Sequence, residues 1–432
     1  MFNAAIYQTR RARLAAQLGD GIAIIATAPE ATRNRDSHYP YRFDSYFYYL
    51  TGFTEPEAVV VIIGGATPRS LLFCRDKDET REIWDGFRYG PVAAQQTFAF
   101  DAAYSINELD SQLPELMGNV GKLVYPVGFD PEWDARVLGW LNAVRGKARQ
   151  GIRAPKEIID VRAMLDEMRL FKDSQEIDTM RRSGRIASDA HRRAMRATRP
   201  GRFEFEIEAE LLHHFYAQGA QSPAYTSIVA GGANACVLHY VENRAALKDG
   251  DLLLIDAGCE LDGYASDVTR TFPVNGTFSA AQKDAYEVVL AAQNAAIDII
   301  RTSGPWIAPH TAAVRVLTQG MIDLKLLSGS VDGLIESEAY SRFYMHRTGH
   351  WLGLDVHDAG EYKVDGEWRA LQPGMTLTVE PGLYIRAADD VPEALWNIGI
   401  RIEDDVLVTE DGVEVLTSAP RTVADIEEWM RG

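Results

Sequence analysis

The sequence predicts an α/β domain followed by an α+β domain, and three observations lead to this prediction. The chain has 432 residues, whereas a single hydrophobic core usually stops growing at about 250 to 300 residues. Its composition, with 46% hydrophobic and 25% charged residues, is that of an ordinary globular protein. After residue 218, well-separated strand runs and two long helical stretches replace the short runs of the first part.

The first domain combines short β-branched runs with helical patterns. Apolar residues recur at helical spacing over residues 4–18, which predicts an opening helix. Polar and helical stretches separate the runs that follow, and this alternation is typical of an α/β domain. The predicted strands cover residues 22–25, 58–63, 71–73 and 123–125.

The boundary between the two predicted domains lies near residues 170–173. The pattern is helical over residues 158–169, and Asp173 is followed three residues later by Glu176. This spacing is the signature of a capping box, and it predicts a long helix that runs to about Thr198. The predicted domains are residues 1–172 and residues 173–432.

The second domain mixes helices with strands of mostly antiparallel character. Pro200 and Gly201 end the long helix, and a further helical pattern follows over residues 204–218. Two more helical stretches cover residues 280–302 and 310–327. Helices interspersed with such strands predict an α+β sheet domain. The predicted strands cover residues 252–255, 267–272, 375–379, 399–408 and 413–416.

The charge and the cysteine content exclude several partners and locations. The formal net charge is -18, so the chain would repel phosphate backbones and anionic lipid headgroups. Three cysteines without a CxxC pair give no disulfide framework. The N-terminus lacks the apolar stretch of a signal peptide, and no apolar run approaches the ~18 residues of a membrane span. We expect a cytoplasmic protein that binds neither nucleic acid nor membranes.

Four acidic residues of the second domain abut or interrupt apolar strand runs. Asp256 and Glu380 each follow such a run, and Asp267 begins a predicted strand. A charge beside a buried strand is costly unless it is paired or bound to a metal. The alternating pattern of the last long strand aims Arg401 and Glu403 to the same side. These positions predict a site that gathers several carboxylates.

Histidines accompany these acids. Four of the nine histidines fall beside the strands that carry the acids, namely His239, His346, His350 and His357. Taken alone, each is more often a structural or surface histidine. Several carboxylates with one imidazole suit divalent Mn, Co or Fe, whereas structural zinc normally recruits thiolates. The pattern therefore favours a carboxylate-rich metal site.

The motifs of other hydrolases do not match. His346 and His350 have the spacing of a zinc protease helix, but Arg347 stands where the H-E-x-x-H motif requires Glu. Gly349 also disfavours a helix there. The chain has no G-x-S-x-G elbow, and the pair Gly231-Gly232 is too little for a phosphate loop.

Seven segments together form a specific set of motifs. In the second domain they are IDAG at 255–258, GYASDVTRTFP at 263–273, HRTGHWLGLDVH at 346–357, TVEPGLY at 378–384 and GIRIED at 399–404; in the first, RNRDSHYPYR at 33–42 and YLTGF at 49–53. This set resembles the metallopeptidases of the pita-bread fold, and within them the Xaa-Pro aminopeptidases (aminopeptidase P). The resemblance covers essentially the whole chain. It implies an aminopeptidase P-type α/β domain followed by an α+β pita-bread (creatinase/aminopeptidase) catalytic domain.

The resemblance also implies a pair of divalent metal ions, with manganese as the expected metal. Asp256 would chelate one metal and His350 the other, whereas Asp267, Glu380 and Glu403 would be shared or flank both. Glu380 would in addition serve as the acid/base of the reaction. All five positions carry the expected residue types.

Other site residues follow from the same resemblance. His239 and His357 match positions that line the substrate pocket and act in catalysis. His346 would also act in the reaction, next to the ligands, while Tyr384 and Arg401 would orient ligands and offset carboxylate charge. Asp36 and Trp84 resemble residues that reach the active site, also from a neighbouring subunit. The residues concerned are His239, His357, His346, Tyr384, Arg401, Asp36 and Trp84.

The implied activity is removal of the N-terminal residue from peptides whose second residue is proline. The resemblance also implies a homo-oligomer, either a dimer or a tetramer. A prolidase, which acts on Xaa-Pro dipeptides with the same metals, is the closest alternative. A non-catalytic peptide-binding protein of the same fold is the other, although the complete ligand set argues against it.

Overall fold

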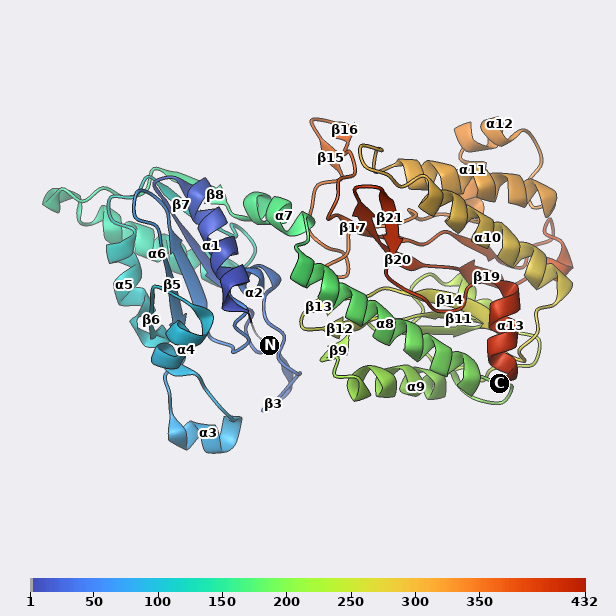
Figure 1. Ribbon diagram of the computed structural model, residues 1–432, viewed down its shortest axis with the longest axis horizontal. Coiled ribbons are helices and arrows are strands. Elements are labelled where there is room, and N and C mark those ends of the chain that lie inside the picture. Colours follow the sequence, from blue (N-terminus) through green and yellow to red (C-terminus); the bar gives the residue numbers. More distant parts are fainter. Residues whose placement is uncertain (1–2) are drawn as a thin grey trace. The chain divides into compact units, whose positions relative to one another are not determined.

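The computed structural model describes residues 3–432, and it divides into two compact units. Unit 1 is Met1–Met168 and unit 2 is Arg169–Gly432. Figure 1 shows both units with their elements labelled. Within residues 3–432, no helix is both long and apolar enough to cross a membrane.

Unit 1 is built around one mixed six-stranded sheet with the order β6-β5-β4-β1-β7-β8. The central strand β1 pairs antiparallel with β4 and parallel with β7. Ile22, Ile24 and Ile25 of β1 are fully buried, because the strand is covered on both faces. The strands are β1 (Gly21–Ala26), β4 (Val59–Ile63), β5 (Arg69–Cys74), β6 (Ala102–Ser105), β7 (Lys122–Tyr125) and β8 (Glu157–Asp160).

The helices of unit 1 agree with the predicted α/β character. The opening helix α1 (Ala4–Leu18) has the predicted bounds. The short helix α3 (Glu79–Asp85) carries no buried side chain. A small hairpin joins β2 to β3. The other elements are α2 (Ser45–Thr51), α3 (Glu79–Asp85), α4 (Gly90–Phe98), α5 (Leu109–Leu116), α6 (Pro131–Arg145), β2 (Thr32–Asn34) and β3 (Ser37–His38).

Two edge strands of this sheet escaped the sequence prediction. Strands β6 and β8 are four residues each and partly exposed, so neither has an apolar run that stands out. The helix predicted from residue 158 is wrong at its start, because residues 157–160 pair with β7. The helix that follows, α7 (Arg162–Leu170), begins only at Arg162.

The segment between the units is tied to unit 2 by ion pairs. The predicted boundary followed residue 172, whereas the units divide after Met168. A guanidinium nitrogen of Arg169 lies 2.6 Å from Oδ1 of Asp358, and Nζ of Lys172 lies 2.9 Å from Oδ2. All three side chains are buried, so residues 169–172 pack as part of unit 2.

Four long helices frame unit 2, and most of its strands lie between the pair α8/α9 and the pair α10/α11, whereas the hairpin of β15 and β16 lies at the edge of the unit (Figure 1). Helix α8 begins with the predicted capping box of Asp173 and Glu176. Helices α10 and α11 are displaced from the predicted bounds by a few residues at one or both ends. The helices are α8 (Ser174–Ala197), α9 (Glu204–Ala217), α10 (Ala280–Asp298), α11 (Ala308–Asp323), α12 (Val331–Glu336) and α13 (Val423–Arg431).

The strands of unit 2 form several small antiparallel sheets. Their orders are β10-β11-β14, β13-β12-β9, β17-β20-β21, β18-β19 and β15-β16. Such antiparallel sheets framed by helices agree with the expected pita-bread domain. The strands are β9 (Ser222–Pro223), β10 (Ile228–Gly231), β11 (Leu252–Asp256), β12 (Cys259–Leu261), β13 (Tyr264–Ala265), β14 (Thr269–Pro273), β15 (Lys363–Val364), β16 (Glu367–Trp368), β17 (Thr376–Val379), β18 (Gly382–Ile385), β19 (Ile398–Arg401), β20 (Asp404–Thr409) and β21 (Gly412–Val415).

One long predicted strand is in fact two strands. The run predicted over residues 399–408 changes partner, since β19 pairs with β18 and β20 pairs with β17. Ile402 and Glu403 lie between the two strands, and the backbone of Glu403 bridges to Thr269 instead. The prediction that Arg401 and Glu403 share one strand was therefore wrong. The strand predicted from Asp267 likewise begins only at Thr269.

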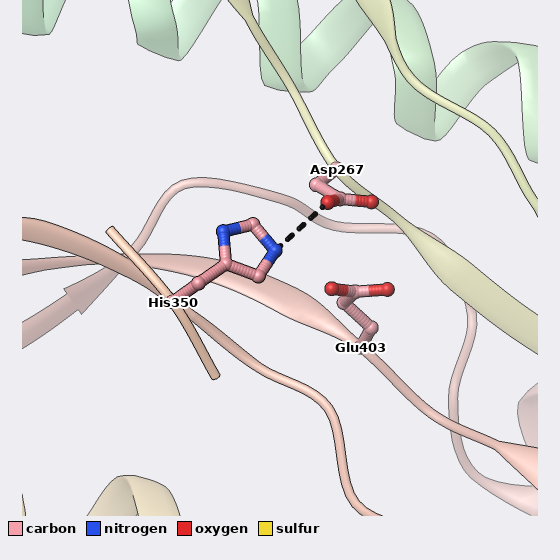
Figure 2. Close-up of side chains that lie close together, drawn as sticks. All are labelled: Asp267, His350 and Glu403. Atoms are coloured by element: carbon pink, nitrogen blue, oxygen red, sulfur yellow. Dashed lines mark ion pairs between the residues drawn. The ribbon is translucent and has the colours of Figure 1, made fainter. Parts of the chain in front are cut away.

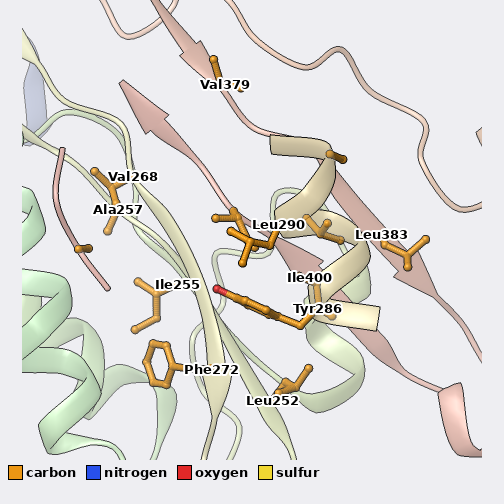
Figure 3. Packing of buried hydrophobic residues seen from close by; sticks show 14 of the residues in the cluster. Leu252, Ile255, Ala257, Val268, Phe272, Tyr286, Leu290, Val379, Leu383 and Ile400 are labelled. Carbon is orange, nitrogen blue, oxygen red and sulfur yellow. The ribbon is translucent and has the colours of Figure 1, made fainter. Parts of the chain in front are cut away.

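A continuous apolar core supports the strand ends of unit 2 (Figure 3). Ile255 of β11 and Phe272 of β14 are fully buried, as is Tyr286 of α10. Val379 of β17 and Ile400 of β19 are fully buried too. Because interiors are close-packed, this core fixes the residues that follow or precede these strands.

Candidate metal centre

The predicted acidic residues converge from four strand ends onto one cavity of about 790 Å³. Asp256 is the last residue of β11, and Asp267 comes two residues before β14. Glu380 directly follows β17, and Glu403 lies between β19 and β20. His350 reaches the cavity from a loop, and its neighbour Trp351 bridges to Leu377 of β17.

Three of these side chains meet most closely. Asp267, His350 and Glu403 each offer a ligand atom, and these atoms all lie within 4.8 Å of one another. Figure 2 shows the imidazole pointing at the two carboxylates, with Nε2 of His350 3.3 Å from Oδ2 of Asp267. This spacing suits one shared cation between the three groups.

The other two predicted ligands border the same group. Oε1 of Glu380 lies 3.7 Å from Nε2 of His350. Asp256 is joined to Asp267 by the hydroxyl of Tyr225, which contacts both carboxylates and lies 2.5 Å from Oδ1 of Asp256. One hydroxyl proton serves only one acceptor at a time. The structure thus brings all five predicted metal ligands together.

The electrostatics of the cluster show an excess of negative charge. Burial raises the pKa of Glu380 to about 7; the charges of Asp267 and Asp256 also raise it, whereas those of His350 and Arg401 lower it. Burial and neighbouring carboxylates also raise the pKa of Glu403 well above its ordinary range. For His350, burial lowers the pKa, but Asp267 and Glu380 reverse this and raise it to about 9. Without another cation, Glu380 and Glu403 therefore take up protons more readily than ordinary carboxylates.

The donor set fits divalent metal ions. Bound cations would replace these protons, and carboxylate oxygens with one imidazole are typical ligands of such ions. Nδ1 of His350 lies 2.9 Å from the carbonyl oxygen of Trp351. A proton on Nδ1 satisfies that contact and leaves the Nε2 lone pair facing the carboxylates, as ligand histidines require.

Arg401 connects one side of the cluster to Tyr384 and His346. Its guanidinium lies 2.6 Å from Oδ2 of Asp256 and donates to the Tyr384 hydroxyl at 3.0 Å. That hydroxyl lies 2.8 Å from Nε2 of His346, whose Nδ1 is 3.7 Å from Oε2 of Glu380. The three residues therefore link two of the predicted ligands, Asp256 and Glu380, at the edge of the cluster.

Two uncharged residues of the cluster were missed by the sequence reasoning. The hydroxyl of Thr269 donates to Oε2 of Glu403 at 2.6 Å and accepts from Arg401 at 3.2 Å. Tyr225 bridges Asp256 and Asp267. Thr269 lies within the GYASDVTRTFP motif, whereas no charge or spacing signal marks Tyr225.

His239 and His357 line the same cavity, and both residues are exposed. The His357 ring meets the His350 ring edge-on, with 4.2 Å between the ring centres. Burial and the charge of His350 lower the pKa of His357, so this imidazole is neutral near pH 7. A neutral imidazole in a substrate cavity can donate to a carbonyl oxygen.

Asp36 and Trp84 lie in unit 1, apart in sequence from the cluster. Asp36 is an exposed residue at the turn between β2 and β3. Trp84 lies on α3 with 81% of its surface exposed. Their part in an active site stays a prediction.

Comparisons with known proteins agree with this geometry. Residues 178–410 match the model of metallopeptidase family M24, and residues 7–125 match that of the aminopeptidase P N-terminal domain. The Xaa-Pro aminopeptidase of Escherichia coli K12 is 46% identical over 96% of this chain and 94% of its own length. That of Haemophilus influenzae is 46% identical over 98% of this chain and 96% of its own.

Solved structures give the same result over the full length. The structure of Pseudomonas aeruginosa aminopeptidase PepP has a TM-score of 0.98 and 51% identity, and it covers 100% of this chain and 98% of that one. Escherichia coli aminopeptidase P, solved as a zinc-substituted complex with product, has a TM-score of 0.97 and 44% identity, and it covers 100% of this chain and 98% of that one.

A sequence relative of the other activity is more distant. The human Xaa-Pro dipeptidase is 32% identical over 95% of this chain and 89% of its own length.

Proposed function

This chain belongs to metallopeptidase family M24, and we propose that it is an Xaa-Pro aminopeptidase. The reaction is metal-dependent hydrolysis of the bond between the N-terminal residue of a peptide and the proline that follows. The observation that carries the proposal is the convergence of Asp256, Asp267, His350, Glu380 and Glu403 on one cavity. The 46% identity with two Xaa-Pro aminopeptidases supports it.

The proposed cofactor is a pair of divalent metal ions, with manganese as the expected metal. Asp256 and His350 would each bind one ion, while Asp267, Glu380 and Glu403 would be shared. When bound, such ions activate a water molecule and polarise the scissile carbonyl. Manganese prefers sites rich in carboxylates to sites that contain thiolates.

Glu380 is the proposed proton carrier. Its carboxylate lies at the edge of the cluster, 3.7 Å from both His350 and His346. It would take a proton from the attacking water and deliver it to the proline nitrogen, which must be protonated to leave as an amine.

The remaining polar residues are proposed to hold substrate and ligands in place. His239 and His357 would donate to the carbonyl oxygen of the scissile bond or of proline. Arg401 and Tyr384 fix the orientation of Asp256, and His346 does the same for Glu380.

Proline recognition is proposed to depend on the apolar wall of the cavity. A bond to proline has no N–H group, so it cannot be held by the hydrogen bond that other peptides offer. The ring instead needs an apolar surface. Side chains of this kind that line the cavity include Ile228, Leu238, Val241, Trp306, Val356, Tyr362 and Trp368.

The arrangement of Arg401 favours an aminopeptidase over a prolidase. A prolidase must hold the free carboxylate of proline close to the metals, which usually takes a bidentate arginine. Arg401 is 96% buried and already bound to Asp256, Tyr384 and Thr269. It is therefore not free to hold a second carboxylate.

The assembly and location of the protein complete the proposal. We propose a cytoplasmic homo-oligomer, a dimer or a tetramer, in which Asp36 and Trp84 approach the substrate of a neighbouring subunit. The large exposed face of Trp84 suits such a contact. The cysteines Cys74, Cys236 and Cys259 are all free and buried, as is usual in a reducing compartment.

Substrate length tests the proposal. We expect Xaa-Pro-Yaa peptides to be cleaved after Xaa with a clearly higher kcat/KM than Xaa-Pro dipeptides, and Xaa-Ala-Yaa peptides to be poor substrates. Steady-state rates on the three peptide classes, measured with the manganese-loaded protein, decide it. A preference for the dipeptide would make the protein a prolidase with the same metal site.

A further inference from the structure

Two exposed cations line the same cavity as the metal-binding carboxylates. They are Arg347, in the loop that carries His346 and His350, and Lys363 of β15. We call this pair the cationic rim. A cation inside a cavity with four carboxylates is unexpected, unless it serves to neutralise them or to bind something else.

The cationic rim does not neutralise the carboxylates. Among the residues that the structure describes, neither Arg347 nor Lys363 has a carboxylate oxygen within 4.0 Å. Arg401, in the same cavity, is by contrast 2.6 Å from Asp256. The chain has 62 acidic residues against 44 basic ones, so acidic partners are abundant and the two cations are left without one.

Lys363 is held by an aromatic contact that leaves its charge intact. Its Nζ lies 4.5 Å from the centre of the Trp368 ring, across the hairpin of β15 and β16. The turn Asp365-Gly366 has positive φ at both residues, 52° and 85°, which is typical of a tight two-residue hairpin. A cation–π contact orients an ammonium group without supplying a counter-charge.

The cationic rim lies at the edge of the cavity. Arg347 and Trp368 also line a neighbouring cavity of about 450 Å³, which runs along Ile307, Val314 and Ile335. Residues shared by two cavities mark the boundary between them. The carboxylate cluster, whose members Asp267 and Glu403 are buried, forms the floor of the first cavity. Two divalent ions on this floor would neutralise its four carboxylates, so the unpaired charge of the cavity is the positive charge at its edge.

This positive edge matches the negatively charged end of a short peptide. A peptide carries a positive amino group at one end and a negative carboxylate at the other, and complementary charges orient a ligand and steer its entry. With the first residue at the metal site, a third residue in extended conformation ends ~10 Å away. Its carboxylate would therefore point out of the acidic floor.

We propose that Arg347 and Lys363 form a subsite for a carboxylate on the residue that follows proline. The ligand is either the C-terminal carboxylate of an Xaa-Pro-Yaa tripeptide or an acidic side chain at the third position of a longer peptide. The subsite rests on the proposed aminopeptidase function, whose substrate range it narrows. It differs from a prolidase clamp, because it holds the residue after proline rather than proline itself.

The test compares three peptides on the manganese-loaded protein: Ala-Pro-Ala, its C-terminal amide, and the amide of Ala-Pro-Asp. The first and third carry a carboxylate at the two candidate positions, and the second carries none. We expect kcat/KM for the better acidic peptide to exceed that of the neutral amide by about two- to fivefold for each cation, mainly through KM. High salt should reduce the ratio.

Substitutions of the two cations show whether they cause the ratio of kcat/KM between the acidic peptide and the neutral amide. Lys363→Met and Arg347→Met should each lower it, the double variant should bring it close to one, and Lys363→Arg should retain it. Lys283→Met, which removes an exposed lysine of α10 outside the cavity, should leave it unchanged. If Arg347→Met loses metal because of its neighbour His346, the Lys363 variants still decide the question.

A ratio near one in the unmodified protein, or an unchanged ratio in Lys363→Met, overturns the subsite. Of the two acidic peptides, the one with the higher ratio identifies the carboxylate that is bound. Failure of the protein to cleave any of the three peptides would instead contradict the proposed function.

Discussion

The hydroxyl of Thr348 lies 2.9 Å from Nδ1 of His310, a residue of α11 that contacts no predicted metal ligand. The same hydroxyl is 2.6 Å from that of Tyr344, and both Thr348 and Tyr344 are buried. The carbonyl oxygen of Thr348 accepts from the backbone N–H of Glu380 at 2.8 Å. This network therefore holds the loop between His346 and His350 against the strand end that carries Glu380.

Removing the Thr348 hydroxyl should weaken the metal site without touching a ligand. We expect Thr348→Val to lower metal affinity or kcat by about 10- to 100-fold, the usual range for residues that orient metal ligands. Thr348→Ser, which keeps the hydroxyl, should retain most of the metal affinity and kcat. His310→Asn should retain more of both than His310→Phe. Thr311→Val, at an exposed threonine on the same helix, is the matched control. Metal titration and steady-state kinetics on each variant check this, and equal losses in the serine and valine variants would contradict it.

Substituting the ligands themselves should separate metal binding from chemistry. Asp256→Ala, His350→Ala and Glu403→Ala should abolish turnover by losing metal, whereas Glu380→Gln should keep part of the metal and still fail as a proton carrier. Elemental analysis alongside activity assays distinguishes the two outcomes. Full activity of metal-stripped protein would disprove the mechanism, because no other group of the cavity activates water comparably.

The two exposed histidines should behave differently from the ligands. His239→Ala and His357→Ala should keep metal content near two ions per chain but reduce turnover by roughly two to four orders of magnitude, as for loss of an acid/base or oxyanion partner. The check is metal content and kcat measured on the same preparation. Loss of metal in either variant would make that histidine a ligand and require a new ligand set.

Burial of His191 should make the stability of unit 2 depend on pH. Burial lowers the pKa of His191 to about 4, with a smaller effect of Arg270 in the same direction and opposing effects of Asp256 and Asp404. The unfolded chain, with a histidine pKa of about 6.5, then binds the proton more readily than the folded one. Stability is therefore lost as pH falls from about 6.5 to about 4, by at most ~3 kcal/mol.

This contribution is checked by urea unfolding at pH 7, 5.5 and 4.5, with the metal-free unmodified protein compared with its His191→Gln variant. Nε2 of His191 lies 3.0 Å from the carbonyl oxygen of Ala257, and the glutamine amide can replace that donor. The unfolding midpoint of the unmodified protein should fall more steeply with acidity than that of the variant. Parallel curves would show that His191 does not contribute.

The gathering of the four acidic residues was predictable from the sequence, because each is a charge beside or within an apolar strand run. Asp256 and Glu380 follow buried strands directly, and such positions stand out in a single sequence. Their full assignment still needed the resemblance to a family. Tyr225, Thr348 and His310 were not predicted, because neutral side chains that contact residues distant in sequence leave no periodic or charge signal.

The strand errors have a similar cause. The alternation across residues 398–408 is genuine, yet β19 and β20 pair with different strands, and alternation does not reveal a change of partner. Strands β6 and β8 lie at the two edges of the sheet in unit 1. Edge strands are only partly buried, so they carry a weak apolar pattern.

The bridge between Thr269 and Glu403 has a consequence for how the protein is made. The two residues are 134 positions apart, and one lies beside Asp267 while the other is itself a proposed ligand. A nascent chain that has just emerged through Asp267 holds only two of the five proposed ligands, Asp256 and Asp267. Because metal affinity depends on a folded site, metal loading must await synthesis of Glu403, so a product truncated before Glu403 lacks the complete centre.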